Sequence, residues 1–395
     1  MRVSHRTAQL AESATLAVSA KAARMKADGI DVVSMAAGEP DFDTPDHIKQ
    51  VAITAILEGK TKYSKPSSGL PAAKAAACLK LERENGLTYD PSQVIVTAGA
   101  KDAVQMTFMS VLEPGDEVIL PVPYWVSYPE QIKLAGAVPV FVHGDEVHNF
   151  ELTVGQLEGA ITERTRMLVL NSPNNPGGFT YTPDKIRRIA AFLEGLDILV
   201  LSDEIYDRLT YGGVPHLSIA ATGPDAYGKT VTISGGSKTY AMTGWRIGFA
   251  AGPRYIIDAM AKLQSQRTSG AATFTQLALA EALTGDQSCV ATMRTEFARR
   301  AAHMHRRLSA MPGLTCVEPT GAFYCFPNVL GAYDRLGVNG SVEFADRLLD
   351  EAHVAVVPGI AFGNDAHVRM SFATSMPQID LGLDRLEAFL RRNGS

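Results

Sequence analysis

A lysine and an arginine stand eight residues apart in the segment 231–249, which reads VTISGGSKTYAMTGWRIGF. The segment opens with a short β-branched run typical of a buried strand, and Lys238 follows in a loop of small residues. A lysine at the mouth of a sheet can form a Schiff base with a carbonyl cofactor. The planar guanidinium of Arg246 can neutralise a phosphate. A lysine after a strand is more often a solvated loop charge, so this hypothesis needs support from the rest of the chain.

Polar side chains also follow two other apolar runs. Asn175 comes after the run 167–171, in a turn whose prolines and glycines fix the backbone. Asp203 comes after the run 198–202, and Tyr206 lies three residues further on. A carboxylate at the end of a buried strand needs a cationic partner, and a protonated pyridine nitrogen would be one. The ordinary alternative for Asn175 is a plain Asn-Pro-Gly turn, and for Asp203 it is a carboxylate that caps the next turn.

Three further features suggest an anionic, flat-ringed ligand. The run 94–97 leads through residues 99–101 into a helix, whose free N–H groups could bind a phosphate. Trp125 could stack on a ring, although a core tryptophan is the more common case. Arg369 lies among apolar residues and requires a carboxylate from the protein or a substrate. Each feature alone has an ordinary explanation, but together they favour one site.

Seven apolar runs alternate with helical stretches in the middle of the chain. Each run is almost continuously apolar, as expected of strands covered on both faces. The runs are residues 94–97, 117–121, 138–142, 167–171, 198–202, 231–234 and 247–252. This pattern predicts an α/β domain with a mostly parallel sheet, in which ligands bind beyond the carboxyl ends of the strands.

The pattern is different at both ends of the chain. Helices are expected over 8–28, 45–57 and 71–85, with a short strand at 31–36. After residue 290 we expect a long charged helix over 292–311, a helix from about 342 and a terminal helix. Short strands are expected near 314–317, 323–326, 354–357 and 367–372. This mixture predicts a second, smaller α+β domain.

Composition excludes several classes of protein. The chain has 395 residues, is 46% hydrophobic and carries a net charge of −5, so no basic surface recommends nucleic acid. No apolar run approaches the roughly 18 residues of a membrane helix, and the N-terminus lacks the continuous apolar core of a signal peptide. The four cysteines are scattered and form no metal-binding pattern, which predicts reduced thiols and a cytoplasmic location.

A series of sequence blocks resembles the fold-type I, class I aminotransferases that use pyridoxal 5'-phosphate, and within them the bacterial aspartate aminotransferase subgroup, which includes aspartate/prephenate aminotransferases. The blocks are AAGEPDFDTP, KTKYSKPSSGLP, NGLTYDPSQVIVTAGAKDAV, EPGDEVILPVPYWVSYPE, NSPNNPGG, LSDEIYD, SKTYAMTGWRIGFAAGP, PTGAFYCF, VAVVPG and HVRMSFATS. The resemblance implies a large cofactor-binding domain of residues 40–290. It also implies a discontinuous small domain of residues 1–39 and 291–395.

The resemblance also implies roles around the cofactor ring. Lys238 would form the internal aldimine and shuttle a proton between the substrate Cα and the cofactor. Asp203 would pair with the pyridinium nitrogen and keep it protonated. Tyr206 and Asn175 would hydrogen-bond the 3'-oxygen of the ring, and Trp125 would stack on it. Trp125 and Asn175 would also line the substrate site.

The remaining implied roles concern the phosphate and the substrate. Arg246, Ser237 and the backbone of Gly99, Ala100 and Lys101 would hold the phosphate. Tyr63 would reach the phosphate of the neighbouring subunit, which makes the active unit a homodimer. Arg369, with the backbone of Gly38, would bind the α-carboxylate of the substrate. Lys101 and Thr15 would meet the distal carboxylate of a dicarboxylic substrate.

These roles predict transamination between L-aspartate and 2-oxoglutarate with ping-pong kinetics. Small amino and keto acids would be the partners, and neither nucleic acid nor membrane is expected. Prephenate, aromatic or broad-specificity transamination and a C–S β-lyase are alternatives on the same scaffold. A non-catalytic ligand sensor is a further one, but an intact Lys238 argues against it.

Three residues depart from the family pattern. Gly177 stands where threonine is usual, which should loosen the loop but leave Asn175 in place. Gly235 stands where many relatives carry a phosphate-binding serine. Arg267 is unusual for the subgroup. It is interpreted as a surface charge. The alternative is that Arg267 of one subunit binds the distal carboxylate of the substrate in the other subunit.

Overall fold

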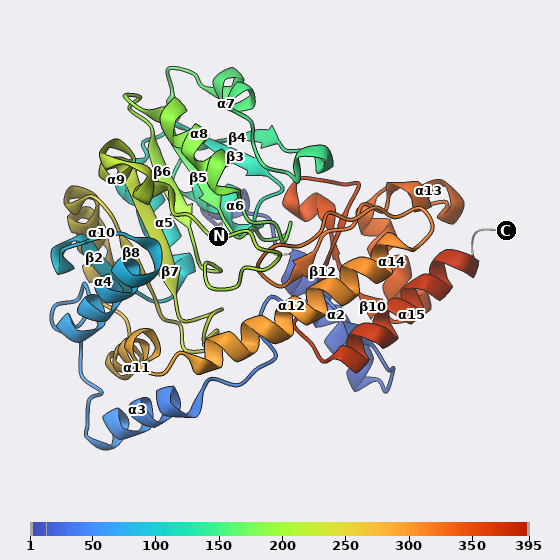
Figure 1. Ribbon diagram of the computed structural model, residues 1–395, viewed down its shortest axis with the longest axis horizontal. Coiled ribbons are helices and arrows are strands. Elements are labelled where there is room, and N and C mark those ends of the chain that lie inside the picture. Colours follow the sequence, from blue (N-terminus) through green and yellow to red (C-terminus); the bar gives the residue numbers. More distant parts are fainter. Residues whose placement is uncertain (1–2, 13, 393–395) are drawn as a thin grey trace.

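The computed structural model describes residues 3–12 and 14–392, and a seven-stranded sheet lies within one half of it (Figure 1). The strand order is β2-β8-β7-β6-β5-β3-β4, and β8 is antiparallel to both of its neighbours while the other pairs are parallel. The strands are β2 (Val94–Thr97), β3 (Glu117–Val122), β4 (Val138–His143), β5 (Thr165–Asn171), β6 (Leu199–Asp203), β7 (Thr230–Gly235) and β8 (Gly248–Ala251). The seven strands predicted from the sequence, and the mostly parallel α/β fold, are confirmed.

Both faces of this sheet are covered by helices, which explains the continuous apolar runs. Successive side chains of a strand point to opposite faces, so Leu201 packs with α5 and α10 on one face while Val200 packs with α8 on the other. The helices around the sheet are α3 (Asp46–Leu57), α4 (Pro71–Asn85), α5 (Ala100–Val111), α6 (Ser127–Leu134), α7 (Val154–Ala160), α8 (Pro183–Leu193), α9 (Pro224–Lys229), α10 (Arg254–Arg267) and α11 (Thr273–Thr284). The short 3₁₀ helices are Pro91–Gln93, Glu146–His148, Ile219–Thr222 and Gly359–Phe362.

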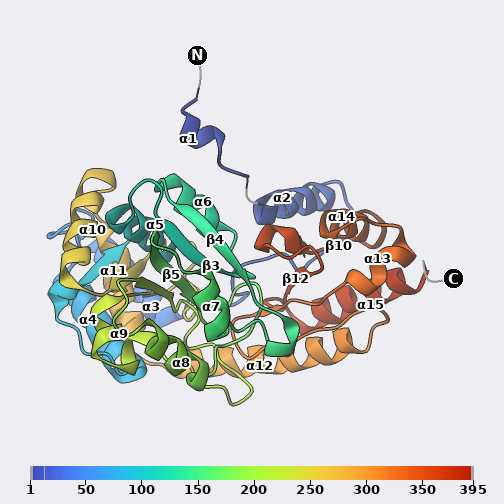
Figure 2. The same cartoon turned by 90° about the horizontal axis from the view of Figure 1, so that it is seen from above.

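The two ends of the chain meet in a second group of elements, and α12 runs from the sheet towards it (Figure 1). Strand β1 pairs with β10 in parallel, and β11, β12 and β9 form an antiparallel sheet. The strands are β1 (Val33–Ser34), β9 (Tyr324–Cys325), β10 (Val354–Ala355), β11 (Val357–Pro358) and β12 (Val368–Ser371). The helices are α2 (Ala14–Ala27), α12 (Ser288–Ser309), α13 (Leu330–Leu336), α14 (Ser341–Ala352) and α15 (Met376–Arg392). Helix α1 (His5–Ala8) instead contacts α6. Beyond this contact, α1 extends away from the rest of the molecule (Figure 2).

Three predicted elements differ from the structure. The strand expected at 314–317 is wrong, because Thr315 forms an isolated bridge with Asn328 and no ladder. The strand expected at 354–357 is two strands, because Val354 pairs with β1 whereas Val357 pairs with β12. The helix expected over 8–28 is shorter in the structure, because α2 covers Ala14–Ala27 and residues 9–12 are not helical, while residue 13 lies outside the described residues.

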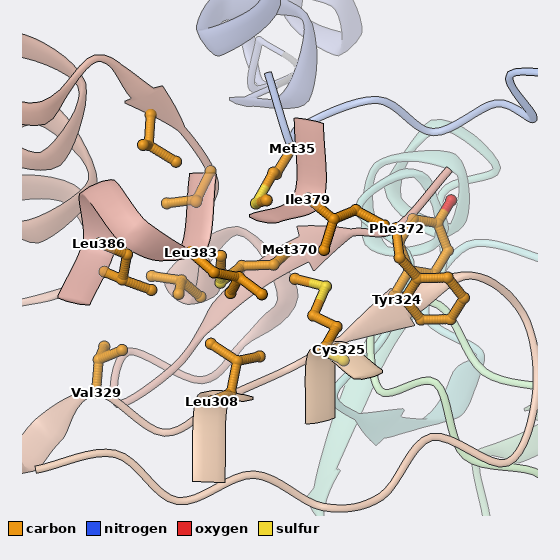
Figure 3. Close-up of a cluster of buried hydrophobic side chains, with 14 of the residues drawn as sticks. Met35, Leu308, Tyr324, Cys325, Val329, Met370, Phe372, Ile379, Leu383 and Leu386 are labelled. Carbon is orange, nitrogen blue, oxygen red and sulfur yellow. The ribbon is translucent and has the colours of Figure 1, made fainter. Parts of the chain in front are cut away.

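A buried apolar cluster joins the second group of elements to the sheet. Its labelled members include Leu308, Met370, Phe372 and Leu386 (Figure 3). Tyr324 is also a member and is fully buried. The cluster also contains Tyr206, which follows β6. Packing in this cluster therefore connects the end of β6 with β9 and β12. The domain limits at 40 and 290 stay a prediction.

No helix of the described chain is long and apolar enough to span a membrane. The cysteines are unpaired within residues 3–12 and 14–392, and no group of potential metal ligands occurs there. The cytoplasmic location stays a prediction.

Candidate active site

The carboxyl ends of the parallel strands bring the predicted residues to one edge of the sheet. Asn171 at the end of β5 pairs with Asp203 at the end of β6, and Asp203 pairs with Ile233 of β7. Lys238 follows β7 by three residues. The side-chain oxygen of Asn171 accepts a hydrogen bond from the backbone N–H of Asn175 at 2.9 Å, which fixes that loop over the strand ends.

Lys238 lies in a partly buried position among aromatic side chains. Its Nζ donates to the backbone carbonyl of Gly38 and lies 5.9 Å and 5.8 Å from the ring centres of Tyr206 and Phe323. Burial, and then the charge of Arg369, lower the pKa of Lys238 to about 8. The neutral amine, which can accept a proton or attack a carbonyl, is therefore accessible at mildly alkaline pH.

Asp203 is a buried carboxylate without an ion-pair partner among the described residues. Its Oδ2 accepts from the hydroxyl of Tyr128 at 2.7 Å and its Oδ1 from the backbone N–H of Ile205 at 3.2 Å. Burial raises the pKa of Asp203 to about 6 against the opposing effect of these hydrogen bonds. A cation placed beside this carboxylate would relieve the unfavourable burial of its charge.

Arg369 is held rigidly at the centre of the site with one donor left open. Its side chain is almost fully buried and donates to Asn175 Oδ1 at 3.0 Å and to the carbonyl of Ala36 at 2.8 Å. The guanidinium lies 4.5 Å from the ring centre of Tyr324, whose hydroxyl is 3.0 Å from that of Tyr206. The Nε atom of Arg369 is buried without a hydrogen-bond partner. Burial lowers the pKa of this arginine, because its positive charge is unfavourable away from water. A carboxylate placed beside the guanidinium would offset this cost and would itself be stabilised.

The guanidinium of Arg246 lies close against Gly99 at the start of α5. Gly99 has a φ of 93°, and a Cβ built on it would lie 2.7 Å from Nη2 of Arg246. Arg246 itself has a φ of 50°, uncommon for a residue with a side chain and frequent at functional sites. Its Nη1 donates to the carbonyl of Thr243 at 2.8 Å. The N–H of Gly99 donates to the carbonyl of Thr97 at 2.8 Å, so the N–H groups of Ala100 and Lys101 in the first helical turn, together with this guanidinium, are suited to bind an anion.

Lys101 lies beside the indole of Trp125, with its Nζ 4.9 Å from the ring centre. Burial, and then the charge of Arg246, lower the pKa of Lys101, and no ion pair neutralises it among the described residues. Its neighbour Asp102 is instead paired with Arg267 at 2.9 Å. This ion pair links α5 to the end of α10 within one chain, which favours a structural interpretation of Arg267.

Four other predicted residues lie less centrally. Ser237 is buried in the loop that carries Lys238, and Gly38 supplies the carbonyl that Lys238 binds. Thr15 is half-buried on α2, and its contribution to substrate binding stays a prediction. Tyr63 is 81% exposed in the isolated chain, so its own chain does not bring it into the site.

Two aromatic residues of the site were not identified from the sequence. Tyr128 is the side-chain donor to Asp203, and Tyr324 links Tyr206 with the stacked Arg369. A signal existed for Tyr128, because it lies three residues after Trp125 and therefore on the same side of a helical turn. Tyr324 offered no local signal, since its role depends on the pairing of β9 with β12.

The structure also accounts for the two unusual glycines. A Cβ on Gly177 would lie 2.5 Å from the ring of Phe179 and 2.9 Å from Oδ1 of Asn174, and the segment 171–180 is buried throughout. This close packing argues against the expected loosening of the loop. A Cβ on Gly235 would lie 2.8 Å from Cα of Gly248 in the adjacent strand. A serine at 235 would therefore require the two strands to separate.

Comparisons with known proteins agree with this geometry. Residues 30–386 match the family model described as aminotransferase class I and II. The chain is 48% identical to an aspartate aminotransferase of Geobacillus stearothermophilus, with 99% of each chain covered. It is 44% identical to a probable aspartate/prephenate aminotransferase of Rhizobium leguminosarum bv. phaseoli, covering 95% of this chain and 96% of that one. The solved aspartate aminotransferase of Thermus thermophilus with maleate is 42% identical with a TM-score of 0.93, covering 98% of this chain and 100% of that one.

Proposed function

This chain belongs to the class I and II aminotransferase family, and on that premise we propose that it catalyses transamination between L-aspartate and 2-oxoglutarate with pyridoxal 5'-phosphate as cofactor. The observation that carries the proposal is the convergence of Lys238, Asp203 and Arg369 on one sheet edge. An amine with a lowered pKa, a buried carboxylate that lacks a cation and a buried arginine with an open donor suit this chemistry.

The residues present fit the cofactor. The start of α5 is suited to a phosphate, because the absence of a Cβ at Gly99 lets the guanidinium of Arg246 lie beside the N–H groups of the first helical turn. The uncompensated carboxylate of Asp203 is suited to a protonated pyridine nitrogen. In this arrangement Arg246, Ser237 and the backbone of residues 99–101 would hold the phosphate. Trp125 would cover the ring, and Asn175 and Tyr206 would bind its 3'-oxygen.

When bound, the cofactor supplies an electron sink for the electron pair that remains after the substrate Cα loses its proton. Lys238 Nζ would hold the cofactor carbon in the resting enzyme and, once released, accept the Cα proton. Its lowered pKa makes the neutral amine available for this transfer. Asp203 would keep the pyridine nitrogen protonated, since its charge has no other cationic partner among the described residues. Arg369 would orient the substrate through its α-carboxylate. The first keto acid would leave before the second keto acid enters the same site, so the kinetics should be ping-pong.

Two observations support a dicarboxylic substrate such as aspartate. Lys101 carries a charge without a carboxylate partner in the described chain, beside the indole that would cover the ring. The relative from Thermus thermophilus was solved with maleate, a dicarboxylate. Prephenate is the second candidate, because a relative is named an aspartate/prephenate aminotransferase. Lys101 would serve the distal carboxylate of either acid.

The experiment that tests the proposal is half-reaction spectroscopy on the purified holoenzyme. Aspartate, glutamate, phenylalanine and arogenate are added singly, and conversion of the bound cofactor to its amine form is followed by absorbance. Fast conversion by aspartate and glutamate and little by phenylalanine is expected. Fast conversion by arogenate, the amino acid that corresponds to prephenate, would show that the enzyme also transaminates prephenate. If a neutral amino acid reacted fastest, the dicarboxylate assignment would be wrong.

Lys101→Gln is expected to raise KM for aspartate by roughly 10- to 100-fold, because a charge-assisted hydrogen bond to the distal carboxylate is lost. KM for phenylalanine should change little. Arg267→Ala is the matched control, since it removes a nearby cation whose partner is Asp102, and should change aspartate kinetics by less than about threefold. A large effect of Arg267→Ala would instead support the alternative, in which Arg267 binds the distal carboxylate of the substrate in the other subunit.

We also propose that the enzyme is a homodimer in which Tyr63 completes the site of its partner. Large apolar side chains are exposed on one helix and the loop after it, as expected of a surface covered by a second subunit. They are Ile53, Ile56 and Leu57 of α3, together with Tyr63. A tyrosine that is exposed in its own chain fits a contact across this surface.

Hybrid dimers test the role of Tyr63. Tyr63→Phe should lower activity about tenfold through loss of one hydrogen bond to the phosphate, and Lys238→Ala should abolish it. Unfolding and refolding the two variants together would give hybrids with one intact site, formed by Lys238 of one subunit and Tyr63 of the other. Activity of the mixture should therefore exceed the sum of the separate variants. No gain on mixing would show that Tyr63 acts within its own chain.

A further inference from the structure

A cluster of buried polar and charged side chains lies behind the turn that carries Asp203 and Tyr206. Two neighbouring segments and the distant helix α4 contribute to it, and none of the members belongs to the cofactor or substrate site described above. The members are Lys80, Glu84 and Asn85 of α4, Ser202, Glu204 and Asp207 at the end of β6, and His216 and Ser218 in the loop before the 3₁₀ helix Ile219–Thr222.

Glu204 is the best-buried acid of this cluster, with 1% of its surface exposed. Its Oε1 accepts from the hydroxyls of Ser202 at 2.8 Å and Ser218 at 2.6 Å. Its Oε2 accepts from Nδ2 of Asn85 at 2.9 Å and Nε2 of His216 at 3.0 Å. Four donors therefore hold one carboxylate, which fixes both its position and its orientation.

Asp207 is held from the same side by α4. Lys80 Nζ forms an ion pair with Asp207 and donates to Oδ1 of Asn85 at 2.7 Å. Nδ2 of Asn85 lies 3.4 Å from Asp207 and also serves Glu204, so this amide links the two acids. Burial raises the pKa of Asp207, but the charges of Lys80 and then His216 bring it below its ordinary value. The ion pair is therefore formed near neutral pH.

The side chains of the turn from Asp203 to Asp207 point alternately towards the candidate active site and towards the buried polar cluster. Asp203 points to the face where Tyr128 of α6 lies, whereas Glu204 points to the opposite face and Asn85. Tyr206 reaches Tyr324, whereas Asp207 returns to Lys80. The backbone of this turn also supplies the N–H of Ile205 that binds Asp203 Oδ1 at 3.2 Å. The orientation of the Asp203 carboxylate thus depends on the placement of the turn.

We propose that Glu204 is a positioning residue: α4 and the loop 216–218 hold it from behind, and it fixes the turn that presents Asp203 and Tyr206 to the cofactor, an inference that rests on the proposed function. Small displacements of groups at a reacting centre reduce binding and rate strongly, whereas a purely structural contact would affect stability alone. The contacts of Glu204 therefore act on cofactor binding through Asp203.

Glu204→Gln tests this proposal on the holoenzyme. The amide keeps the shape of the side chain but replaces one acceptor by a donor. That donor either opposes Nδ2 of Asn85 or makes the hydroxyls of Ser202 and Ser218 turn and accept, so the set of four donors is lost in both orientations. Glu117→Gln is the matched control, because Glu117 is also a buried acid of the central sheet, 5% exposed and held by Thr162 and by Arg164 at 2.9 Å. It begins β3, at the opposite edge of the sheet from the site.

Both variants are expected to lower the melting temperature. Glu204→Gln should in addition raise the dissociation constant of pyridoxal 5'-phosphate by about tenfold, measured by quenching of tryptophan fluorescence. It should also shift the pH at which the visible spectrum of the bound cofactor changes. Equal losses of stability in both variants, with an unchanged dissociation constant and spectrum, would overturn the proposal. A wild-type protein that does not bind the cofactor would instead contradict the proposed function.

Ser218→Ala gives a second, milder variant that keeps the charge of Glu204. It removes one of the two donors to Oε1 and should raise the dissociation constant in the same direction by about threefold. If Glu204→Gln fails to fold, Ser218→Ala still tests whether the contacts of Glu204 affect cofactor affinity. It also separates position from charge, because a purely electrostatic effect of Glu204 would leave Ser218→Ala with wild-type cofactor affinity, contrary to the proposal.

Discussion

Replacing Lys238 by alanine is expected to lower kcat/KM for aspartate by at least roughly 10⁴-fold, because the variant loses both the covalent attachment of the cofactor and the base that moves the Cα proton. The methyl group of alanine cannot reach the position between Gly38, Tyr206 and Phe323 that Nζ occupies. The visible absorption band of the covalently held cofactor should disappear, while Arg246 and Asp203 remain to bind it non-covalently.

Steady-state assays and absorption spectra of the purified variant measure both effects. Lys133→Ala is a suitable control, because Lys133 forms an ion pair with Glu130 at 3.0 Å on the surface and should leave both properties unchanged. A Lys238→Ala enzyme that kept even a hundredth of the wild-type activity would contradict the assignment of this lysine.

The same substitution should change how the stability of the cofactor-free protein depends on pH. The pKa of Lys238 is about 8 in the folded state and 10.5 ordinarily, so the unfolded chain binds more protons between these values. The wild-type free energy of unfolding should gain a contribution from this group as pH rises through that window. Lys238→Ala should lack this contribution, which urea unfolding at several pH values between 7.5 and 10 would show.

The sequence predicted the sheet because its signals are local. Each strand of the large sheet is buried on both faces, so its apolar run is visible without knowledge of its neighbours. The strand at 354–357 was predicted as one element because its residues are uniformly apolar. Its division depends on partners at Val33 and Arg369, which no local pattern contains.

The candidate site shows the same limit. Lys238, Asp203 and Asn175 follow strands directly, so their meeting at one edge could be inferred from the parallel order. The donor to Asp203, the stacking of Tyr324 on Arg369 and the contacts of Glu204 join residues separated by 75, 45 and 119 positions. These contacts arise from packing in three dimensions, so residue types and spacing could not indicate them.

Asp203→Asn is expected to lower kcat by roughly 10²- to 10³-fold while making the cofactor-free protein more stable. The activity falls because a neutral amide cannot keep the pyridine nitrogen protonated, and the electron sink weakens. The stability rises because the wild-type carboxylate is buried beside a tyrosine hydroxyl and one N–H without a cation in the described chain.

The size and the pH dependence of the stability change follow from the pKa. A rise from 3.8 to about 6 corresponds to about 3 kcal/mol of lost stability once both states are ionised. The folded state binds the proton more tightly, so the stability of the cofactor-free wild type should fall as pH rises from about 4 to 6 and stay low above it. Asparagine does not titrate, but it loses one acceptor worth about 1 kcal/mol. We therefore expect a net gain of about 2 kcal/mol at pH 7.5.

Denaturant unfolding of both cofactor-free proteins at pH 5 and 7.5 measures this difference. The gain should be about 2 kcal/mol at pH 7.5 and less than about 1 kcal/mol at pH 5, where the carboxyl of the folded wild type is mostly protonated. Adding the cofactor should stabilise the wild type more than Asp203→Asn, because the pyridinium relieves the buried charge in the wild type alone. If the variant were instead less stable than the wild type at pH 7.5, the carboxylate would already be satisfied by the protein. Its burial could then not be the force that draws a protonated ring nitrogen into the site.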